Sequence, residues 1–287
     1  MSVFQLALSR VQRLASFSHG TTGGNPAGVY LDDVFPDDAT MQAVAHAVGY
    51  SETAFAVKEG DGWRVRYFAP ESEVPFCGHA TIALGAVLAE QYGDGVFPLN
   101  TNTDRITVEG CHAGALVEAA LQSPATHSRK APEELTTQAL ALFGYAAGDL
   151  DTRLLPGLAY AGALHLILPL NDRSSLAAMA YDLERGRILM RDAGLATIAL
   201  VYAETEQRFH ARNPFASGGV YEDPATGAAA AALAGYLRDS GWPQAGRIDI
   251  LQGDDMGSPS RLHVEFSSTP GESVRVSGTV RPLPAVL

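Results

Sequence analysis

The sequence contains an internal repeat: its two halves present the same kinds of segment in the same order, and this limits the possible folds. Each half shows an amphipathic helical segment ended by a glycine, a strand-like run, a return strand, and an apolar helix that begins at a glycine. Thr53, Arg64 and Pro70 have counterparts 144 residues later, whereas Gly78 has its counterpart, Gly227, 149 residues later. One loop insertion explains this step, so we interpret the pattern as a duplication. The alternative is two unrelated segments that share turn signals, which accounts less well for order and spacing together.

The first copy predicts a helix that is capped by Asp37 or Asp38 and ended by Gly49. Apolar residues recur within it at the i, i+3, i+4, i+7 spacing of one buried face. These residues are Met41, Val44, Ala45 and Val48.

Both copies then predict a β-hairpin followed by a mostly apolar helix. In the first copy the strands are expected at 51–57 and 64–70, and the helix from Gly78 to about residue 90. The second copy predicts a helix at 183–193, strands at 197–201 and 208–214, and a helix from Gly227.

A chain of 287 residues with 46% hydrophobic residues can bury a large core. The mixture of segments indicates a mixed α/β or α+β fold, with a first half at 1–118 and a second half at 119–273. We expect a last strand-like segment, within 274–287, to return to the first half.

Charge and cysteine content limit the possible partners. The net charge of −12, without a local cluster of Lys or Arg, argues against nucleic acid as a partner. The chain has only two cysteines, Cys77 and Cys111, at a spacing typical of neither a disulfide scaffold nor a zinc site. No segment resembles a signal peptide or a membrane span, so we expect a cytoplasmic protein without membrane contact.

The helices that begin at Gly78 and Gly227 are apolar on nearly all sides, which is typical of buried helices. The first amides of a helix lack partners within the helix and favour anions, and a glycine lets a ligand approach the backbone. For one helix alone, an ordinary role in the core is the better interpretation. Because the arrangement occurs twice, we expect the two N-termini to face one cleft and bind a small carboxylate.

Five motifs, in their order along the chain, resemble those of the phenazine-biosynthesis isomerase (PhzF-like) family. They are Gly24-Asn-Pro-Ala-Gly28, Ser51-Glu-Thr-Ala-Phe55, Arg66-x-Phe68-x-Pro70, Cys77-Gly-His-Ala-Thr81 and Glu222-Asp-Pro-Ala-Thr-Gly227. The resemblance implies an α+β fold of the diaminopimelate-epimerase-like kind. Such a fold has two pseudo-symmetric domains, each a β-barrel-like sheet around a central helix, and the protein is usually a homodimer.

The resemblance also implies the roles of individual residues. Glu52 resembles the family's catalytic acid/base, with His79 and Asp223 as polar catalytic partners. Substrate would contact a second group of residues: Gly78, Gly227, Ala228, Asn25 and Thr226. Many relatives have a serine where this chain has Ala228, which leaves the particular substrate open.

The residues themselves support an acid/base role for Glu52 at the start of its strand, where a carboxylate would be partly removed from water. Its counterpart in the second half is Ala196, so only one half carries the base. Cys77 has Thr226 as its counterpart, which rules out a two-thiol racemisation, and we interpret Cys77 as a buried small residue.

Cofactors are not expected. The glycine-rich segment at 20–28 does not match the dinucleotide pattern, and no His/carboxylate spacing indicates a metal. The predicted function is a cofactor-independent isomerase that shifts a proton on a small carboxylate. The alternatives are an amino-acid epimerase or racemase on the same fold and a non-catalytic protein that binds a small acid.

Overall fold

The computed structural model describes residues 2–103, 105–243 and 246–284, and the chain divides into two compact units. Unit 1 comprises the described residues up to Gln122 together with those from Ser277 onward, and unit 2 comprises Ser123–Val276. Residues 285–287 of the segment expected to return to the first half lie outside the described residues.

Unit 1 is built on a closed ring of strands. Its elements are α1 (Val3–Arg10), β1 (Gln12–Ser18), β2 (Asn25–Asp32), α2 (Asp38–Val48), β3 (Thr53–Glu59), β4 (Gly62–Phe68), β5 (Glu73–Val74), α3 (Gly78–Tyr92), β6 (Gly95–Asn100), β7 (Arg105–Ala113), β8 (Leu116–Gln122) and β17 (Arg275–Pro282). The ring runs β1–β2–β3–β4–β6–β7–β8–β17 and closes where β17 pairs with β1. The pairs β2–β3 and β4–β6 are parallel.

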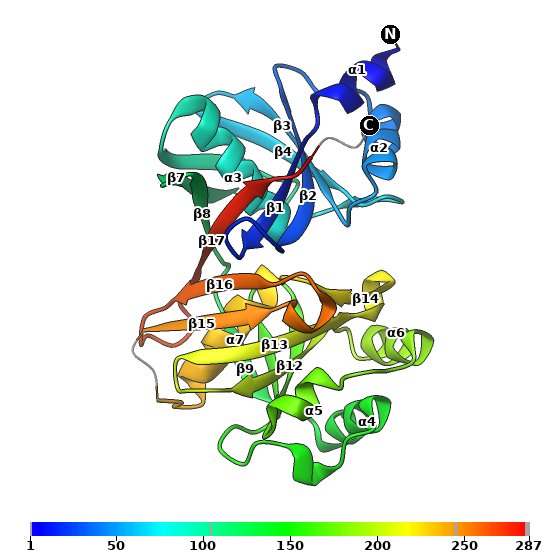
Figure 1. The fold of residues 1–287 in the computed structure, drawn as a ribbon, viewed down its shortest axis with the longest axis vertical. Coiled ribbons are helices and arrows are strands. Elements are labelled where there is room, and N and C mark those ends of the chain that lie inside the picture. Colours follow the sequence, from blue (N-terminus) through cyan, green and yellow to red (C-terminus); the bar gives the residue numbers. More distant parts are fainter. Residues whose placement is uncertain (1, 104, 244–245, 285–287) are drawn as a thin grey trace. The chain divides into compact units, whose positions relative to one another are not determined.

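Helix α3 forms the core of this ring (Figure 1) and contacts β1, β2, β3, β6, β7 and β8. Every residue from His79 to Ala89 is buried. Two glycines allow the helix to lie close to β7. A Cβ atom on Gly85 would lie 2.5 Å from Val108, and one on Gly110 would lie 2.4 Å from the carbonyl oxygen of Gly85. The helix can therefore fill the ring only because these two positions lack side chains.

Helix α2 forms as its sequence predicts. Asp37 is the N-cap and accepts a hydrogen bond from the amide of Thr40, and Gly49 ends the helix with a left-handed backbone. The four apolar residues at helical spacing are its buried residues, and they pack with α1 and with Phe55 of β3.

Unit 2 repeats the construction of unit 1. Its elements are β9 (His127–Lys130), α4 (Glu133–Phe143), β10 (Gly157–Tyr160), β11 (Leu164–Leu170), α5 (Arg173–Ala177), α6 (Leu183–Asp192), β12 (Thr197–Ala203), β13 (Arg208–Phe215), β14 (Val220–Asp223), α7 (Gly227–Asp239), β15 (Arg247–Gln252) and β16 (Ser260–Glu265). Short 3₁₀ turns lie at Ala147–Asp149, Ala216–Gly218 and Asp254–Met256.

Six strand pairings of unit 1 have counterparts in unit 2. The series β1 to β7 and the series β10 to β16 show the same succession of antiparallel and parallel pairs around a buried helix, α3 in one and α7 in the other (Figure 1). Helix α7 packs against β9, β10, β11 and β16. The predicted α+β fold of two pseudo-symmetric halves, each a sheet around a central helix, is confirmed. Among the described residues, no helix combines the length and apolar character needed to cross a membrane.

Candidate active site

Four polar side chains of unit 1 meet where β3 and α3 begin, and we call Ser51, Glu52, Cys77 and His79 the acid–base cluster. Oε2 of Glu52 lies 3.5 Å from Nε2 of His79, and the two side chains are 13% and 8% exposed. The imidazole also contacts the other two members, since Oγ of Ser51 lies 3.2 Å from Nε2 and Sγ of Cys77 lies 3.3 Å from Nδ1. The histidine therefore links a carboxylate to a thiol.

Strand β2 positions the backbone of Glu52. The amide of Gly28 donates a hydrogen bond of 3.2 Å to the carbonyl oxygen of Glu52. A Cβ atom on Gly28 would lie 2.7 Å from Oγ1 of Thr53, so this close pairing needs glycine. Asn25 begins the same strand, is buried, and lies opposite Ser16 of β1. The predicted motif at 24–28 thus supports the start of β3.

Strand β1 positions the backbone of His79. Oγ of Ser16 donates a hydrogen bond of 2.7 Å to the carbonyl oxygen of His79. The pairing of β1 with β17 is irregular between Ser16 and Ser18, and the intervening Phe17 is fully buried with a φ of 61°. A positive φ is rare for a bulky residue, and such β-bulges often lie beside functional sites.

A chain of hydroxyl groups supports the first turn of α3. The hydroxyl of Thr81 donates to the carbonyl oxygen of Cys77 over 2.7 Å and lies 2.6 Å from the hydroxyl of Tyr67. Complete burial raises the pKa of Tyr67 far above its ordinary value, so its phenol stays neutral and donates to Thr81.

The N-cap of α3, Cys77, makes no side-chain capping bond among the described residues. The Cys77 side chain therefore does not bond the first amides of this helix, which start with Gly78, and the helix dipole favours negative charge at this end.

A second polar group lies in unit 2 where β14 ends and α7 begins, and we call Asp223, Thr226 and Gln252 the Asp223 cluster. The hydroxyl of Thr226 donates to Oδ2 of Asp223 over 2.5 Å. The amide of Gln252 donates to the carbonyl oxygen of Asp223 (2.7 Å) and lies 3.1 Å from the Thr226 hydroxyl, while its Oε1 accepts from the Thr226 backbone amide (3.3 Å). Gln252 thus ties the Asp223 carbonyl to the start of α7.

Helix α7 begins in the same way as α3. Its N-cap, Thr226, makes no side-chain capping bond in the described part of the chain, because its hydroxyl is directed to Asp223 instead. Gly227 and Ala228 are the first two residues of the helix. The backbone amides of Gly227 and Ala228 therefore have the same position at a helix start as the first amides of α3, where an anion is favoured.

A buried ion pair holds the strand that leads into the Asp223 cluster. Nε and Nη2 of Arg212 on β13 donate hydrogen bonds of 2.9 Å and 2.5 Å to the two carboxylate oxygens of Glu222 on β14. The two side chains are 8% and 3% exposed. The remaining guanidinium nitrogen donates to the carbonyl oxygens of Ala177 and Met179. Because Glu222 directly precedes Asp223, this pair positions the predicted catalytic carboxylate.

The structure brings the predicted residues into two groups. Glu52, His79, Gly78 and Asn25 lie in unit 1, and a second group lies in unit 2: Asp223, Thr226, Gly227 and Ala228. Cys77 is buried, as expected, and it also contacts the His79 ring.

Sequence reasoning missed the contacts of Ser51 and Gln252, and also the position of Asn213. Asn213 lies opposite Asp223, is 1% exposed, and has an Oδ1 atom with no hydrogen-bond partner among the described residues. A signal existed for Ser51, which directly precedes Glu52. Gln252 and Asn213 reach the cluster only through strand pairing.

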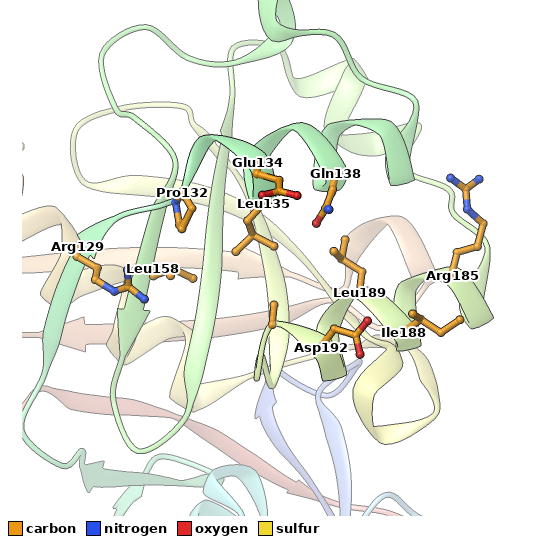
Figure 2. A pocket seen from close by; sticks show the side chains of 11 residues that line it. Arg129, Pro132, Glu134, Leu135, Gln138, Leu158, Arg185, Ile188, Leu189 and Asp192 are labelled. Carbon is orange, nitrogen blue, oxygen red and sulfur yellow. The ribbon is translucent and has the colours of Figure 1, made fainter.

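Unit 2 also contains a cavity of about 600 Å³ that holds none of the predicted site residues. Figure 2 shows Leu135 of α4 and Leu189 of α6 lining it between the two helices. Its four charged residues, Arg129, Glu134, Arg185 and Asp192, are all exposed. Because the cavity buries no acid or base, we place the chemistry at the polar clusters instead.

Comparison with known proteins identifies related sequences and folds. Residues 14–283 match the family described as phenazine biosynthesis-like protein. An uncharacterized isomerase from Deinococcus radiodurans is 33% identical over 94% of this chain and 92% of its own length. The trans-2,3-dihydro-3-hydroxyanthranilate isomerase of Pseudomonas aeruginosa is 30% identical over 92% of this chain and 93% of its own length. A Bacillus anthracis protein of the PhzF family has the same fold, with a TM-score of 0.84, 21% identity and 96% coverage of each chain.

Proposed function

Because the chain belongs to the phenazine biosynthesis-like protein family and is an isomerase, we propose that it shifts a proton between carbons of a small carboxylate without a cofactor. The observation that carries this proposal is the acid–base cluster, in which the Glu52 carboxylate lies 3.5 Å from His79 at the start of α3. The cluster joins a largely buried carboxylate to a partner that can hold or pass a proton.

Glu52 is the general base and then the general acid. Its carboxylate takes a proton from a carbon of the substrate, and the electron pair of that C–H bond moves into the conjugated system of the substrate. The carboxyl hydrogen of protonated Glu52 exchanges with solvent, and Glu52 then delivers a proton to a different carbon. One C–H bond is broken and another is formed, so no oxidant or reductant is required.

His79 and Asp223 orient polar groups of the substrate, and the amides of Gly78 and Gly227 bind its carboxylate. Two observations support these roles. Each glycine begins a buried helix whose N-cap makes no side-chain capping bond in the described part of the chain. Asp223 is held by its own contacts with Thr226, so its carboxylate needs little reorganisation to bind a ligand.

A screen of small carboxylic acids by NMR in deuterated water tests the proposal. The expected result is deuterium in the product of at least one acid with the wild type and with Glu71→Gln, an exposed glutamate in the same unit. Glu52→Gln should lower the exchange rate at least 1,000-fold while the circular dichroism spectrum stays unchanged. Full exchange with Glu52→Gln would refute the role of this carboxylate.

The same experiment separates the alternative functions. Deuterium at the original carbon together with inverted configuration would indicate an epimerase, whereas deuterium at a second carbon indicates the proposed isomerisation. If acids bind but none exchanges a carbon-bound proton, the chain is a binding protein rather than the proposed enzyme.

The family resemblance also supports a homodimer. Light scattering coupled to gel filtration should give twice the mass of one chain, and the mass of a single chain would contradict this proposal.

A further inference from the structure

The acid–base cluster combines three donor types that bind transition metals. Glu52 offers a carboxylate oxygen, His79 a ring nitrogen and Cys77 a sulfur, and one such atom from each lies within 4.8 Å of the other two. A thiolate, an imidazole and a carboxylate are the ligand types that select Zn²⁺ and similar thiophilic ions over Mg²⁺ or Ca²⁺. We propose that Glu52, Cys77 and His79 form a binding site for a thiophilic divalent cation that blocks the proposed proton transfer.

One donor pair has the spacing that a shared ion requires, and a second pair is slightly longer. Bonds of about 2.0–2.3 Å around a tetrahedral Zn²⁺ place neighbouring donor atoms roughly 3.3–3.8 Å apart. Nε2 of His79 lies 3.5 Å from Oε2 of Glu52 and 4.0 Å from Sγ of Cys77. This nitrogen can therefore serve as the common ligand with small side-chain adjustments.

Charge also favours a cation when the thiol is ionised. The thiolate and the carboxylate carry two negative charges, which balance the two positive charges of the ion, and the positive end of the α3 dipole stabilises the thiolate. Binding releases the thiol proton to water, so affinity should rise with pH. The 13% exposure of Glu52 leaves access for the ion and for a water molecule as the fourth ligand.

The backbone already holds the ligands in place. Ser16 fixes the carbonyl oxygen of His79, Gly28 fixes that of Glu52, and Thr81 fixes that of Cys77. Two of the three ligands belong to the start of one buried helix. A site with such support needs little ordering of the protein when the ion binds.

The consequence is reversible inhibition. An ion bound to Glu52 removes the lone pair that would accept the substrate proton, and it occupies the imidazole at the same time. The metal site itself depends on donor geometry, so it can be tested by spectroscopy without any substrate.

Titration with Co²⁺ tests the site, because a Co²⁺–thiolate bond adds a charge-transfer band in the near ultraviolet. The chain offers a matched control, since its second cysteine, Cys111, lies half-buried on β7. The wild type and Cys111→Ser should show the band at one equivalent of Co²⁺, and Zn²⁺ should remove it by competition. Cys77→Ser should lack the band, while Glu52→Gln should keep it with at least tenfold weaker binding.

Each result supports or overturns the proposal. A band that persists in Cys77→Ser, disappears in Cys111→Ser or is missing from the wild type would overturn it. Unchanged Co²⁺ affinity in Glu52→Gln would also overturn the three-ligand site. If Co²⁺ binds as proposed but no acid exchanges a proton, the metal site stands and only the proposed isomerisation fails.

Discussion

The amide of Gly28 and the carbonyl oxygen of Glu52 are joined by a hydrogen bond of 3.2 Å, which fixes where the proposed base enters β3. This contact requires a close approach of two strands. Next to Gly28 lies the buried side chain of Thr53, and both of its terminal heavy atoms would lie within 3.0 Å of an added Cβ.

We therefore predict that Gly28→Ala lowers the free energy of unfolding by about 1–3 kcal/mol and reduces proton exchange, because β2 and β3 must separate. Thr53→Ala removes the atoms that the new methyl group would meet. In the double variant the two losses should be less than additive, as measured by urea unfolding in a double-mutant cycle. Strictly additive losses would show that the contact between residues 28 and 53 does not cause the destabilisation of Gly28→Ala.

Gln252→Leu should destabilise unit 2. The side-chain amide of Gln252 donates to the carbonyl oxygen of Asp223 and to the hydroxyl of Thr226, and it accepts from the backbone amide of Thr226. Leucine would leave these buried polar groups without that partner. A loss of roughly 1–3 kcal/mol is expected. The exposed Gln138 of α4 provides the control, since Gln138→Leu should change stability by less than about 0.5 kcal/mol. Equal effects of the two substitutions in urea unfolding would contradict this reasoning.

The ion pair of Arg212 and Glu222 should behave as a unit. Arg212→Met alone leaves a buried carboxylate and should lower the free energy of unfolding by about 3–5 kcal/mol. Adding Glu222→Leu removes that unpaired charge, so the double variant should be more stable than Arg212→Met. A double variant less stable than the single one, measured by urea unfolding, would show that the pair matters mainly through its other contacts.

His165 should make the protein sensitive to acid. Complete burial lowers the pKa of His165 from its ordinary value of 6.5 to about 4. Its Nδ1 lies 2.8 Å from the Thr197 hydroxyl, and its Nε2 has no hydrogen-bond partner in the described residues. The unfolded chain binds a proton at a higher pH than the folded one. The contribution of neutral, buried His165 to stability is therefore complete above pH 6.5 and is lost as the pH falls towards 4.

The loss attributable to His165 should approach roughly 2–3 kcal/mol near pH 4.5. His165→Gln removes the titrating group and retains a side chain that can bond Thr197. Urea unfolding at pH 7.5 and 4.5 should show a smaller difference for this variant than for the wild type. An identical difference in both proteins would exclude His165 as the source.

Local signals predicted much of the fold because they act within one or two turns of chain. Asp37 and Gly49 bound α2 as predicted, and Thr197 begins its strand where the repeat places it. The last strand-like segment was expected to return to the first half, but which strands it joins to close the ring could not be predicted in this way. The closure depends on pairing β17 with β1 and β8, strands that lie far apart in the sequence.

The candidate site shows the same difference between local and distant relationships. Glu52 and His79 belong to motifs that are recognisable as short segments. The contact of His79 with Cys77 was not predicted, because it depends on the orientation of a side chain at a helix start. Gln252 follows Thr226 by a helix and a strand, so only the parallel pairing of β15 with β13 brings it to the cluster.

The position of β17 constrains how the protein folds during synthesis. This strand lies after nearly all of unit 2 in the sequence, yet it completes the ring around α3 in unit 1. On the ribosome, the first seven ring strands therefore lack β17 and keep two unpaired edges while about 150 further residues are synthesised. Exposed edges of this kind attract other chains, so a nascent unit 1 is the stage at which we expect chaperones to act.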